Sequence, residues 1–257
     1  MSTATRDGEF VQSLERGLSV IRAFSRDRSS LTLSEIADLT GLTRAAARRF
    51  LITLRELGYV ESDGRLFSLR PRVLELGYSY LSSLPVWEIA RPHLEELADV
   101  VRETTSASVL DGADIVFVAR VETKRIMSMT LGVGSRLPAW ATAMGRVLLA
   151  DLPAERLDDY FRQVRMEPLS GRTITNEAEI RRKIDQARAN GWTLVDQEVE
   201  EGVRSLAVPI RSPGGRTEAA LTVCSHAFRV SPERIMEEFL PLVLRTSERI
   251  TADLART

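Results

Sequence analysis

The stretch TGLTRAAARRFLITLRELGY, residues 40–59, decides the fold of the N-terminal part of this 257-residue chain. Gly41 suits the positive φ of a tight turn, and Thr43 is a good N-cap for a following helix. At about 100° per residue, that helix has one apolar face and one basic face. We place Ala47, Phe50, Leu51, Leu54 and Leu57 on the apolar face, and Ala45, Arg48, Arg49, Ile52 and Glu56 on the other.

A shorter helix precedes this turn. The stretch LTLSEIADLTGL, residues 31–42, carries Thr32 and Glu35 at the spacing of a capping box. Two helices joined by a short turn that contains glycine are typical of a helix-turn-helix. Upstream, residues 11–25 predict an amphipathic helix, and the polar break SRDRSS separates it from the pair. Its apolar positions recur at helical spacing: Val11, Leu14, Leu18, Ile21 and Phe24.

The stretch YVESDGRLFSLR, residues 59–70, follows the second helix. Two apolar-containing runs flank Asp63-Gly64, which is the strongest short signal for a β-hairpin. The hairpin predicts the wing of a winged helix-turn-helix. Arg65 then lies at the wing tip, where it suits a contact with phosphate or the minor groove, or is simply a solvated turn residue.

Positive charge gathers in this region although the whole chain has a formal net charge of −1. Residues 39–72 hold seven arginines and three acids, a local net charge of +4. Arginine alone proves little, because only two basic residues of the chain are lysines. A small Ala45 between long cations would let the helix enter a major groove, and an ordinary solvated basic face is the alternative. The expected DNA-contacting residues are Thr32, Thr43, Arg44, Ala45, Arg48, Arg49 and Arg65.

Composition describes a folded chain, 44% hydrophobic and 28% charged. No apolar run approaches the roughly 20 residues that a membrane helix needs. The N-terminus MSTATRDGEF lacks the apolar core of a signal peptide, so we expect residues 1–9 to be a disordered leader. The single cysteine, Cys224, excludes an internal disulfide and fits a reducing cytoplasm.

The remaining chain predicts an α+β domain, an antiparallel sheet with helices packed on it. We expect helices over 72–84, 86–103, 142–152, 153–164, 176–191 and 231–254. We expect strands within 105–121, around a turn at 111–114, and within 125–139, 192–199, 203–211 and 217–227. The predicted organisation is a leader (1–9), a winged helix-turn-helix domain (10–71), a linker helix (72–85) and an effector-binding domain (86–257).

Catalytic and metal-binding patterns are missing from the sequence. No G-x-S-x-G, H-E-x-x-H or C-x-x-C occurs, and His93 and His226 lie in different elements. His93 is expected to be solvated or capping, and Cys224 to be a small buried hydrophobe. The acids Asp196, Glu198, Glu200 and Glu201 indicate a loop surface, although one carboxylate could orient a pocket group. We therefore expect no enzyme, no metal and no cofactor.

A ligand sensor is better supported. In GSRLPAWATAMG, residues 134–145, Thr142 can cap a helix whose free N–H groups favour an anion. Ser205, Thr222 and Cys224 lie on predicted strands, and Thr222 and Cys224, two residues apart, share a sheet face. These groups predict a small-ligand pocket, and satisfied core hydroxyls are the alternative.

The segments SLERGLSVIRAF, LSEIADLTGLTRAAARRFLITLRELGYV and LPAWATAMGRVLLA together resemble the IclR family of transcriptional regulators. GSRLPAWATAMGRVLLADL with DQEVEEGVRSLAVPI is similar to the PcaR, PcaU and PobR subgroup, which governs protocatechuate and 4-hydroxybenzoate breakdown. The resemblance implies a GAF-like effector domain, a dimer through the N-terminal domains and often a dimer of dimers. It also implies a small organic acid effector, in a pocket lined by Ala143, Met144, Ser205, Thr222 and Cys224.

The chain departs from relatives that bind very small acids. Met144 and Val195 make the pocket more apolar, which favours an aromatic acid over glyoxylate. Arg136 is our candidate partner for the carboxylate. The expected function is a regulator that binds double-stranded operator DNA and responds to such an acid. A regulator of another pathway, or a ligand-binding module that does not bind DNA, is the alternative.

Overall fold

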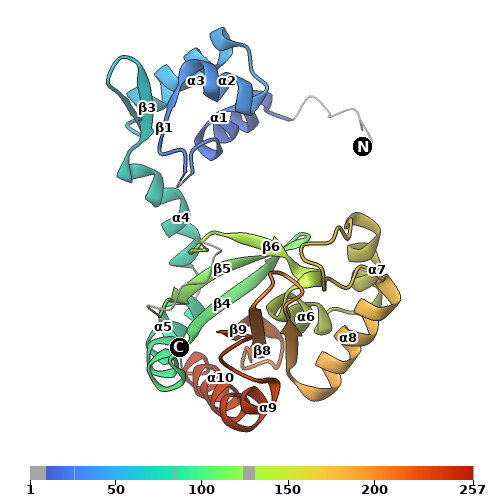
Figure 1. Ribbon diagram of the computed structural model, residues 1–257. Helices are drawn as coiled ribbons and strands as arrows, with labels where there is room; N and C mark the ends of the chain where they lie inside the picture. The colour runs from blue at the N-terminus through green and yellow to red at the C-terminus, as the bar shows by residue number, and fades with distance from the viewer. Residues whose placement is uncertain (1–9, 26, 84, 124–130, 257) are drawn as a thin grey trace. The chain divides into compact units, whose positions relative to one another are not determined.

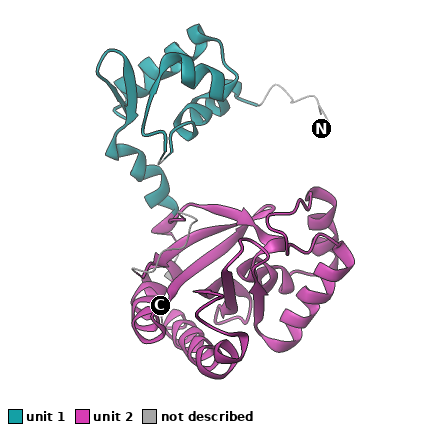
Figure 2. Ribbon diagram, viewed as in Figure 1, with its two compact units in different colours: residues 1–80 teal, residues 81–257 magenta. Residues whose placement is uncertain are grey.

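The computed structural model describes residues 10–25, 27–83, 85–123 and 131–256. The chain divides into two compact units, residues 1–80 and 81–257 (Figure 2). The expected leader, residues 1–9, lies outside the described residues. No helix of the described ranges is long and apolar enough to cross a membrane.

The N-terminal unit is a winged helix-turn-helix. A three-stranded antiparallel sheet of order β1-β3-β2 packs beside three helices. The elements in chain order are α1 (Gln12–Arg22), β1 (Ser30–Thr32), α2 (Leu33–Thr40), α3 (Arg44–Glu56), β2 (Val60–Ser62) and β3 (Leu66–Leu69).

Local hydrogen bonds fix the two central helices. The backbone N–H of Thr32 donates to the Glu35 carboxylate at 2.7 Å, and the backbone N–H of Glu35 donates to the Thr32 hydroxyl at 3.3 Å. This is the predicted capping box. Gly41 ends α2 at φ 67°, and the Thr43 hydroxyl accepts the backbone N–H of Ala46 at 3.2 Å to cap α3. The predicted helix-turn-helix is confirmed.

Two features of this unit differ from the sequence expectation. The break at 25–30 ends in strand β1, whose Ser30 pairs with Ser68 of β3 and lies 2.8 Å from it between hydroxyl oxygens. Strand β1 has three residues, too few for the alternation of buried and exposed side chains to be seen in the sequence. On α1, Val11, Leu14 and Leu18 are exposed rather than packed, because Val20 and Ala23 enter the core instead. Three successive apolar positions of α1 thus face away from their own domain.

A 3-10 turn, η1 (Pro71–Val73), leads from the wing into helix α4 (Leu74–Leu81), as expected for the linker. Helix α5 (Pro85–Val101) opens the second unit. It ends two residues before the expected position because Arg102 takes a positive φ of 58°.

The second unit contains one antiparallel six-stranded sheet of order β6-β5-β4-β9-β8-β7 (Figure 1). Its strands are β4 (Thr104–Asp111), β5 (Asp114–Val121), β6 (Arg136–Pro138), β7 (Thr193–Asp196), β8 (Val203–Arg211) and β9 (Thr217–His226). The antiparallel sheet covered by helices confirms the predicted α+β class. Most of the third predicted strand, residues 124–130, lies outside the described residues.

Helices cover both faces of this sheet. One core joins α5 and α10 (Leu240–Leu254) to the sheet, and a second core joins α6 (Ala143–Ala150), α7 (Ala154–Gln163) and α8 (Glu177–Asn190) to the other face (Figure 1). The predicted final helix begins as α9 (Pro232–Arg234), widens into a π turn, η3 (Ile235–Phe239), and continues as α10. A short 3-10 turn, η2 (Ala139–Ala141), leads into α6.

Candidate DNA-binding and effector sites

Helix α3 separates its residues into a buried and an exposed face. Ala47, Leu51 and Leu54 are buried, whereas Ile52 is 38% exposed. The exposed side also carries four of the predicted DNA-contacting residues, Arg44, Ala45, Arg48 and Arg49. One expectation was wrong: Leu57 is 51% exposed, because the helix ends at Glu56 and the chain turns before the leucine can reach the core.

Acidic partners divide the seven arginines of residues 39–72 into two groups. Arg55, Arg70 and Arg72 each pair with a nearby glutamate, and Arg72 also donates to the Leu57 carbonyl at 2.9 Å. Within the described residues, no ion pair within 4.0 Å engages Arg44, Arg48, Arg49 or Arg65. Of these seven arginines, the ones without an ion pair to a described residue are therefore on the outer face of α3 and on the wing.

Side-chain oxygens of Asp63 and Ser62 hold the wing tip, the latter by accepting the backbone N–H of Gly64 at 3.1 Å. The Asp63 carboxylate accepts the backbone N–H groups of Leu66 at 2.7 Å and Arg65 at 2.8 Å, and these bonds lower the pKa of Asp63. Gly64 takes φ 101°, which glycine tolerates best. The Arg65 side chain is left exposed at the tip.

A cavity of about 40 Å³ lies between the N-terminus of α6 and strands β8 and β9. It brings together all five pocket residues that the resemblance implied, Ala143, Met144, Ser205, Thr222 and Cys224. These positions lie up to 81 residues apart in the chain and meet because α6 packs on this face of the sheet. The remaining lining residues are Phe117, Arg120, Leu131, Leu137, Thr142, Val199, Glu200 and Val203.

The α6 N-terminus forms one end of this cavity. The Thr142 hydroxyl accepts the backbone N–H of Gly145 at 3.0 Å and caps the helix as predicted. A Cβ on Gly145 would stand 2.0 Å from the carbonyl oxygen of Ala139, so only glycine lets α6 approach η2 this closely. Cap and glycine together fix where the first turn of α6 lies.

Polar groups from the sheet form the opposite wall. Ser205 and Cys224 are direct partners on β8 and β9, with Oγ and Sγ 3.2 Å apart. The Thr222 hydroxyl donates to the Leu206 carbonyl at 2.7 Å, so its proton is already used inside the protein. Burial raises the pKa of the Cys224 thiol, which is therefore neutral near pH 7.

The structure does not bring Arg136 to this cavity. Its guanidinium group pairs with Asp111 at 2.6 Å and Asp114 at 3.1 Å, where it closes the β4–β5 hairpin. Sequence reasoning chose it because it precedes the α6 loop, yet β6 pairs with β5 and turns it to those carboxylates.

Arg120 of β5 is the arginine that lines the cavity, and sequence reasoning missed it. Its side chain is only 5% exposed and donates to Glu122 at 3.1 Å and to the Ser106 hydroxyl at 3.3 Å. Phe117 and Arg120 are three apart and would face opposite sides of a regular strand. The β4–β5 register skips Val118, and this bulge puts both residues on the cavity.

The acidic residues of 196–201 do not all form a loop surface. Asp196 pairs with Arg204 at 2.8 Å. Glu198 is buried and binds the fully buried Arg146 through both oxygens, at 3.0 and 2.5 Å. Glu198 is thus the carboxylate of this group that orients another side chain, the Arg146 guanidinium group. The sequence could not show this pairing.

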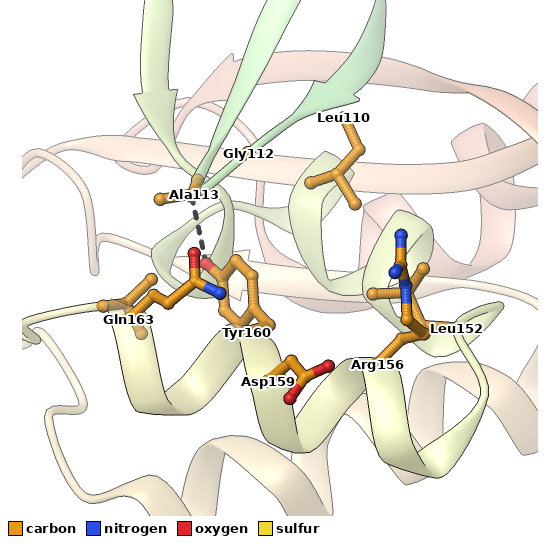
Figure 3. A pocket seen from close by; sticks show the side chains of 9 residues that line it. Leu110, Gly112, Ala113, Leu152, Arg156, Asp159, Tyr160 and Gln163 are labelled. Carbon is orange, nitrogen blue, oxygen red and sulfur yellow. Dashed lines mark hydrogen bonds between the residues drawn. The ribbon is translucent and has the colours of Figure 1, made fainter. Parts of the chain in front are cut away.

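A larger hollow of about 360 Å³ lies between the β4–β5 turn and α7 (Figure 3). Its Tyr160 hydroxyl already donates to the Ala113 carbonyl at 3.1 Å and accepts the backbone N–H of Trp140 at 3.0 Å. Arg156 and Gln163 are exposed at its rim. Polar side chains line this hollow as well, and its buried Tyr160 hydroxyl is already hydrogen-bonded, but the residues that the family resemblance implied gather at the smaller cavity.

Among the described residues, no group of three His, Cys, Asp or Glu side chains could hold a metal ion. His93 is buried rather than solvated, because its Nε2 lies 2.9 Å from the Asp253 carboxylate of α10. His226 packs against Phe228.

A winged helix-turn-helix unit and a second unit with a small, largely apolar cavity are the architecture of a ligand-responsive DNA-binding regulator. Residues 13–64 match the IclR helix-turn-helix domain, and residues 78–252 match the bacterial transcriptional regulator IclR C-terminal domain. The chain belongs to the IclR family and is a transcriptional regulator, not an enzyme. The predicted family resemblance is confirmed.

Individual relatives narrow the comparison. The chain is 43% identical to the Pca regulon regulatory protein of Pseudomonas putida, over 97% of this chain and 86% of the relative. It is 35% identical to the p-hydroxybenzoate hydroxylase transcriptional activator of Acinetobacter baylyi, over 97% and 94%. A crystal structure of an IclR homolog from Microbacterium hydrocarbonoxydans, complexed with 4-hydroxybenzoate, superposes with a TM-score of 0.84 at 25% identity, covering 95% of this chain and all of that one.

Proposed function

We propose that this regulator controls an operon for aromatic acid catabolism and binds an aromatic carboxylic acid in the cavity at the α6 N-terminus. The buried guanidinium group of Arg120 at an otherwise largely apolar cavity carries this proposal. The Arg120 side chain is 5% exposed, with its Nε held by the Glu122 carboxylate and one terminal nitrogen held by the Ser106 hydroxyl. A ligand carboxylate would therefore bind at the terminal nitrogens, which have little water to solvate them. The relatives that regulate pca and p-hydroxybenzoate genes support the same ligand class.

The carboxylate would lie between Arg120 and the first turn of α6. The Thr142 cap uses the N–H of Gly145, which leaves the amides of Ala143 and Met144 for an anion at the positive end of the helix. Phe117 and Leu137 supply apolar walls for a ring. Ser205 and Cys224 remain as polar partners at the sheet.

Cavity size sets a condition on this proposal. Pockets for small ligands usually measure about 300–1,000 Å³, whereas this cavity measures about 40 Å³. An aromatic ring therefore requires side chains to move, and Met144 is suited to this because its side chain is unbranched and flexible. Such a movement at the α6 terminus is a means by which the acid could favour one conformation over another.

The same observation favours a second candidate, a regulator that responds to a small aliphatic acid. Its ligand would fit with less rearrangement. Calorimetric titration with 4-hydroxybenzoate, benzoate, glyoxylate and pyruvate separates the two. We expect the hydroxybenzoate to bind most tightly, and tighter binding of the aliphatic acids would replace the first candidate with the second.

Variants identify the ligand-binding arginine. Arg120→Gln removes the cation that the carboxylate would contact, so acid binding should fall by about tenfold or more. Arg136→Gln is the matched control, because its guanidinium group is held by Asp111 and Asp114 outside the cavity. Equal acid affinities of the two variants would refute the role of Arg120.

The DNA-binding surface follows from α3 and the wing. We infer that Arg44, Ala45, Arg48 and Arg49 enter the major groove, with Thr43 at the helix N-terminus near a phosphate. The lack of protein partners for these arginines among the described residues supports this inference. Thr32 and Arg65 flank this surface as further backbone contacts. Gel shifts with the upstream region of its own operon test binding directly.

Self-association would use the exposed face of α1. Val11, Leu14 and Leu18 are 60%, 63% and 45% exposed and form an apolar stripe on one side of the helix. A second copy would cover this stripe and bring two α3 helices to half-sites about one DNA turn apart. We propose a homodimer on this basis, with a dimer of dimers as the larger assembly that the family resemblance implies.

A further inference from the structure

Arg146 is a fully buried arginine in the middle of helix α6, 0% exposed. Its Nε donates to the Trp140 carbonyl at 3.1 Å, and its two terminal nitrogens bind the two oxygens of Glu198. A buried ion pair contributes little net stability compared with packed apolar side chains, because desolvation opposes the attraction. The main effect of this ion pair is therefore to fix the positions of Trp140 and Glu198 relative to α6.

Glu198 lies in the turn between β7 and β8, and the two residues after it, Val199 and Glu200, line the effector cavity. The turn is also held from its other side. The Thr173 hydroxyl donates to the Glu198 carbonyl at 2.6 Å, and the Ser170 hydroxyl donates to the Gln197 carbonyl at 2.7 Å. Glu198 is thus held by Arg146 and Thr173, and it directly precedes the two residues that line one wall of the cavity.

The Nε of the same guanidinium group fixes the other wall of the cavity, the N-terminus of α6, through Trp140. Trp140 belongs to η2, which leads into the Thr142 cap and the first turn of α6. Its carbonyl is held by Arg146, and its N–H is held by Tyr160, whose hydroxyl binds the Ala113 carbonyl of the β4–β5 turn (Figure 3). The planar guanidinium group therefore ties the α6 N-terminus to the wall at 199–200.

We propose that Arg146 and Glu198 are positioning residues for effector binding, which set the spacing between the α6 N-terminus and the wall at 199–200. The inference rests on the proposed function, since it concerns the same cavity. A planar carboxylic acid held at one wall needs the other wall at a fixed distance. The pair Asp196–Arg204 is a contrast: Arg204 donates to the Val230 carbonyl, and neither residue lines the cavity.

Glu198→Gln and Asp196→Asn form the matched test. Each removes one carboxylate charge, Glu198 in the β7–β8 turn and Asp196 at the end of β7, and leaves a buried arginine with a neutral partner. Groups that orient metal ligands are worth about tenfold or more in affinity, and we expect a similar loss of 4-hydroxybenzoate affinity for Glu198→Gln by calorimetry. Asp196→Asn should stay within about twofold, as for sites that do not interact.

A spectroscopic readout separates positioning from general stability. With Trp87 and Trp192 both replaced by phenylalanine, Trp140 is the one remaining tryptophan of the chain. Glu198→Gln should shift the Trp140 emission, and Asp196→Asn should not. If Glu198→Gln does not fold, Arg146→Lys replaces it, because lysine keeps the charge but cannot hold Trp140 and both Glu198 oxygens together.

Acid affinities and amide hydrogen exchange decide the inference. Equal acid affinities in Glu198→Gln and Asp196→Asn would overturn it, and so would wild-type affinity in Arg146→Lys. If the wild-type protein binds no acid, the proposed function fails, and amide hydrogen exchange at 199–200 then judges the positioning role. Faster exchange in Glu198→Gln than in Asp196→Asn supports it, and equal exchange overturns it.

Discussion

Replacing Gly145 by alanine tests the close approach of α6 to η2. The new Cβ would lie 2.0 Å from the Ala139 carbonyl oxygen and 2.4 Å from its carbonyl carbon and Cα, whereas ordinary contacts begin at 3.4 Å. Backbone atoms must therefore move apart by about 1.4 Å, since no flexible side chain can yield. Overpacking of this kind costs about 3 kcal/mol, and the better helix propensity of alanine offsets about 1 kcal/mol.

We expect a net loss of about 2 kcal/mol in the free energy of unfolding. Urea unfolding followed by tryptophan fluorescence measures it cleanly, because Trp87, Trp140 and Trp192 all lie in the second unit. With a slope of about 2 kcal/mol per molar urea, the midpoint should fall by about 1 M.

Gly132→Ala is the control for this measurement. Its Cβ would meet nothing within 4 Å, and its φ is not in the left-handed region, so stability should change by less than about 1 kcal/mol. A Gly145→Ala protein as stable as the wild type would refute the reasoning, since it would mean that α6 can withdraw from η2 without loss. The acid affinity of Gly145→Ala should fall as well, because the α6 N-terminus would be displaced.

Three further outcomes are expected. The double variant Arg48→Ala, Arg49→Ala should lower the slope of log affinity against log salt concentration in gel shifts by about 1.8, which is about 0.9 for each lost phosphate contact. Arg55→Ala should leave this slope unchanged, because Arg55 is already paired with a glutamate. Leu14→Glu should convert a dimer to a monomer by light scattering, and an unchanged mass would exclude α1 as the interface. The raised pKa of Cys224 keeps its thiol neutral, so alkylation should stay slow at pH 8 and accelerate only at pH values above the ordinary cysteine pKa. Bound acid should slow alkylation further. Rapid alkylation of the folded protein at pH 8 would contradict the burial of Cys224.

Much of the DNA-binding unit could be predicted because its signals are local. The bonds between Thr32 and Glu35, and from Ala46 to Thr43, join residues three apart, so their spacing is visible in the sequence. The same is true of the Asp63 turn. Strand β1 was missed because its three residues are ordered by pairing with β3, more than 30 residues away.

The lining of the cavity at the α6 N-terminus was predicted in part. Ala143, Met144, Ser205, Thr222 and Cys224 came from the family resemblance, and the cavity gathers all of them. Arg136, the expected carboxylate partner, lies outside the cavity, and Arg120 lines it instead. A bulge reverses the facing of β5 between Phe117 and Arg120, and a bulge depends on the register with β4 rather than on the sequence of β5 alone.

The sequence by itself determined the order of elements apart from strand β1, the capped helix pair with its wing, the α+β class of the second unit and the family. Each of these depends on periodicity, caps or turns within a few residues, or on motifs that stand unbroken in the chain. Only the tertiary structure decided which arginines keep no protein partner, that Arg120 rather than Arg136 reaches the cavity, and that Arg146 is buried against Glu198. The reason is that the burial and ion pairing of a charged side chain depend on its neighbours in space, and the partner of Arg146 lies 52 residues away in the chain.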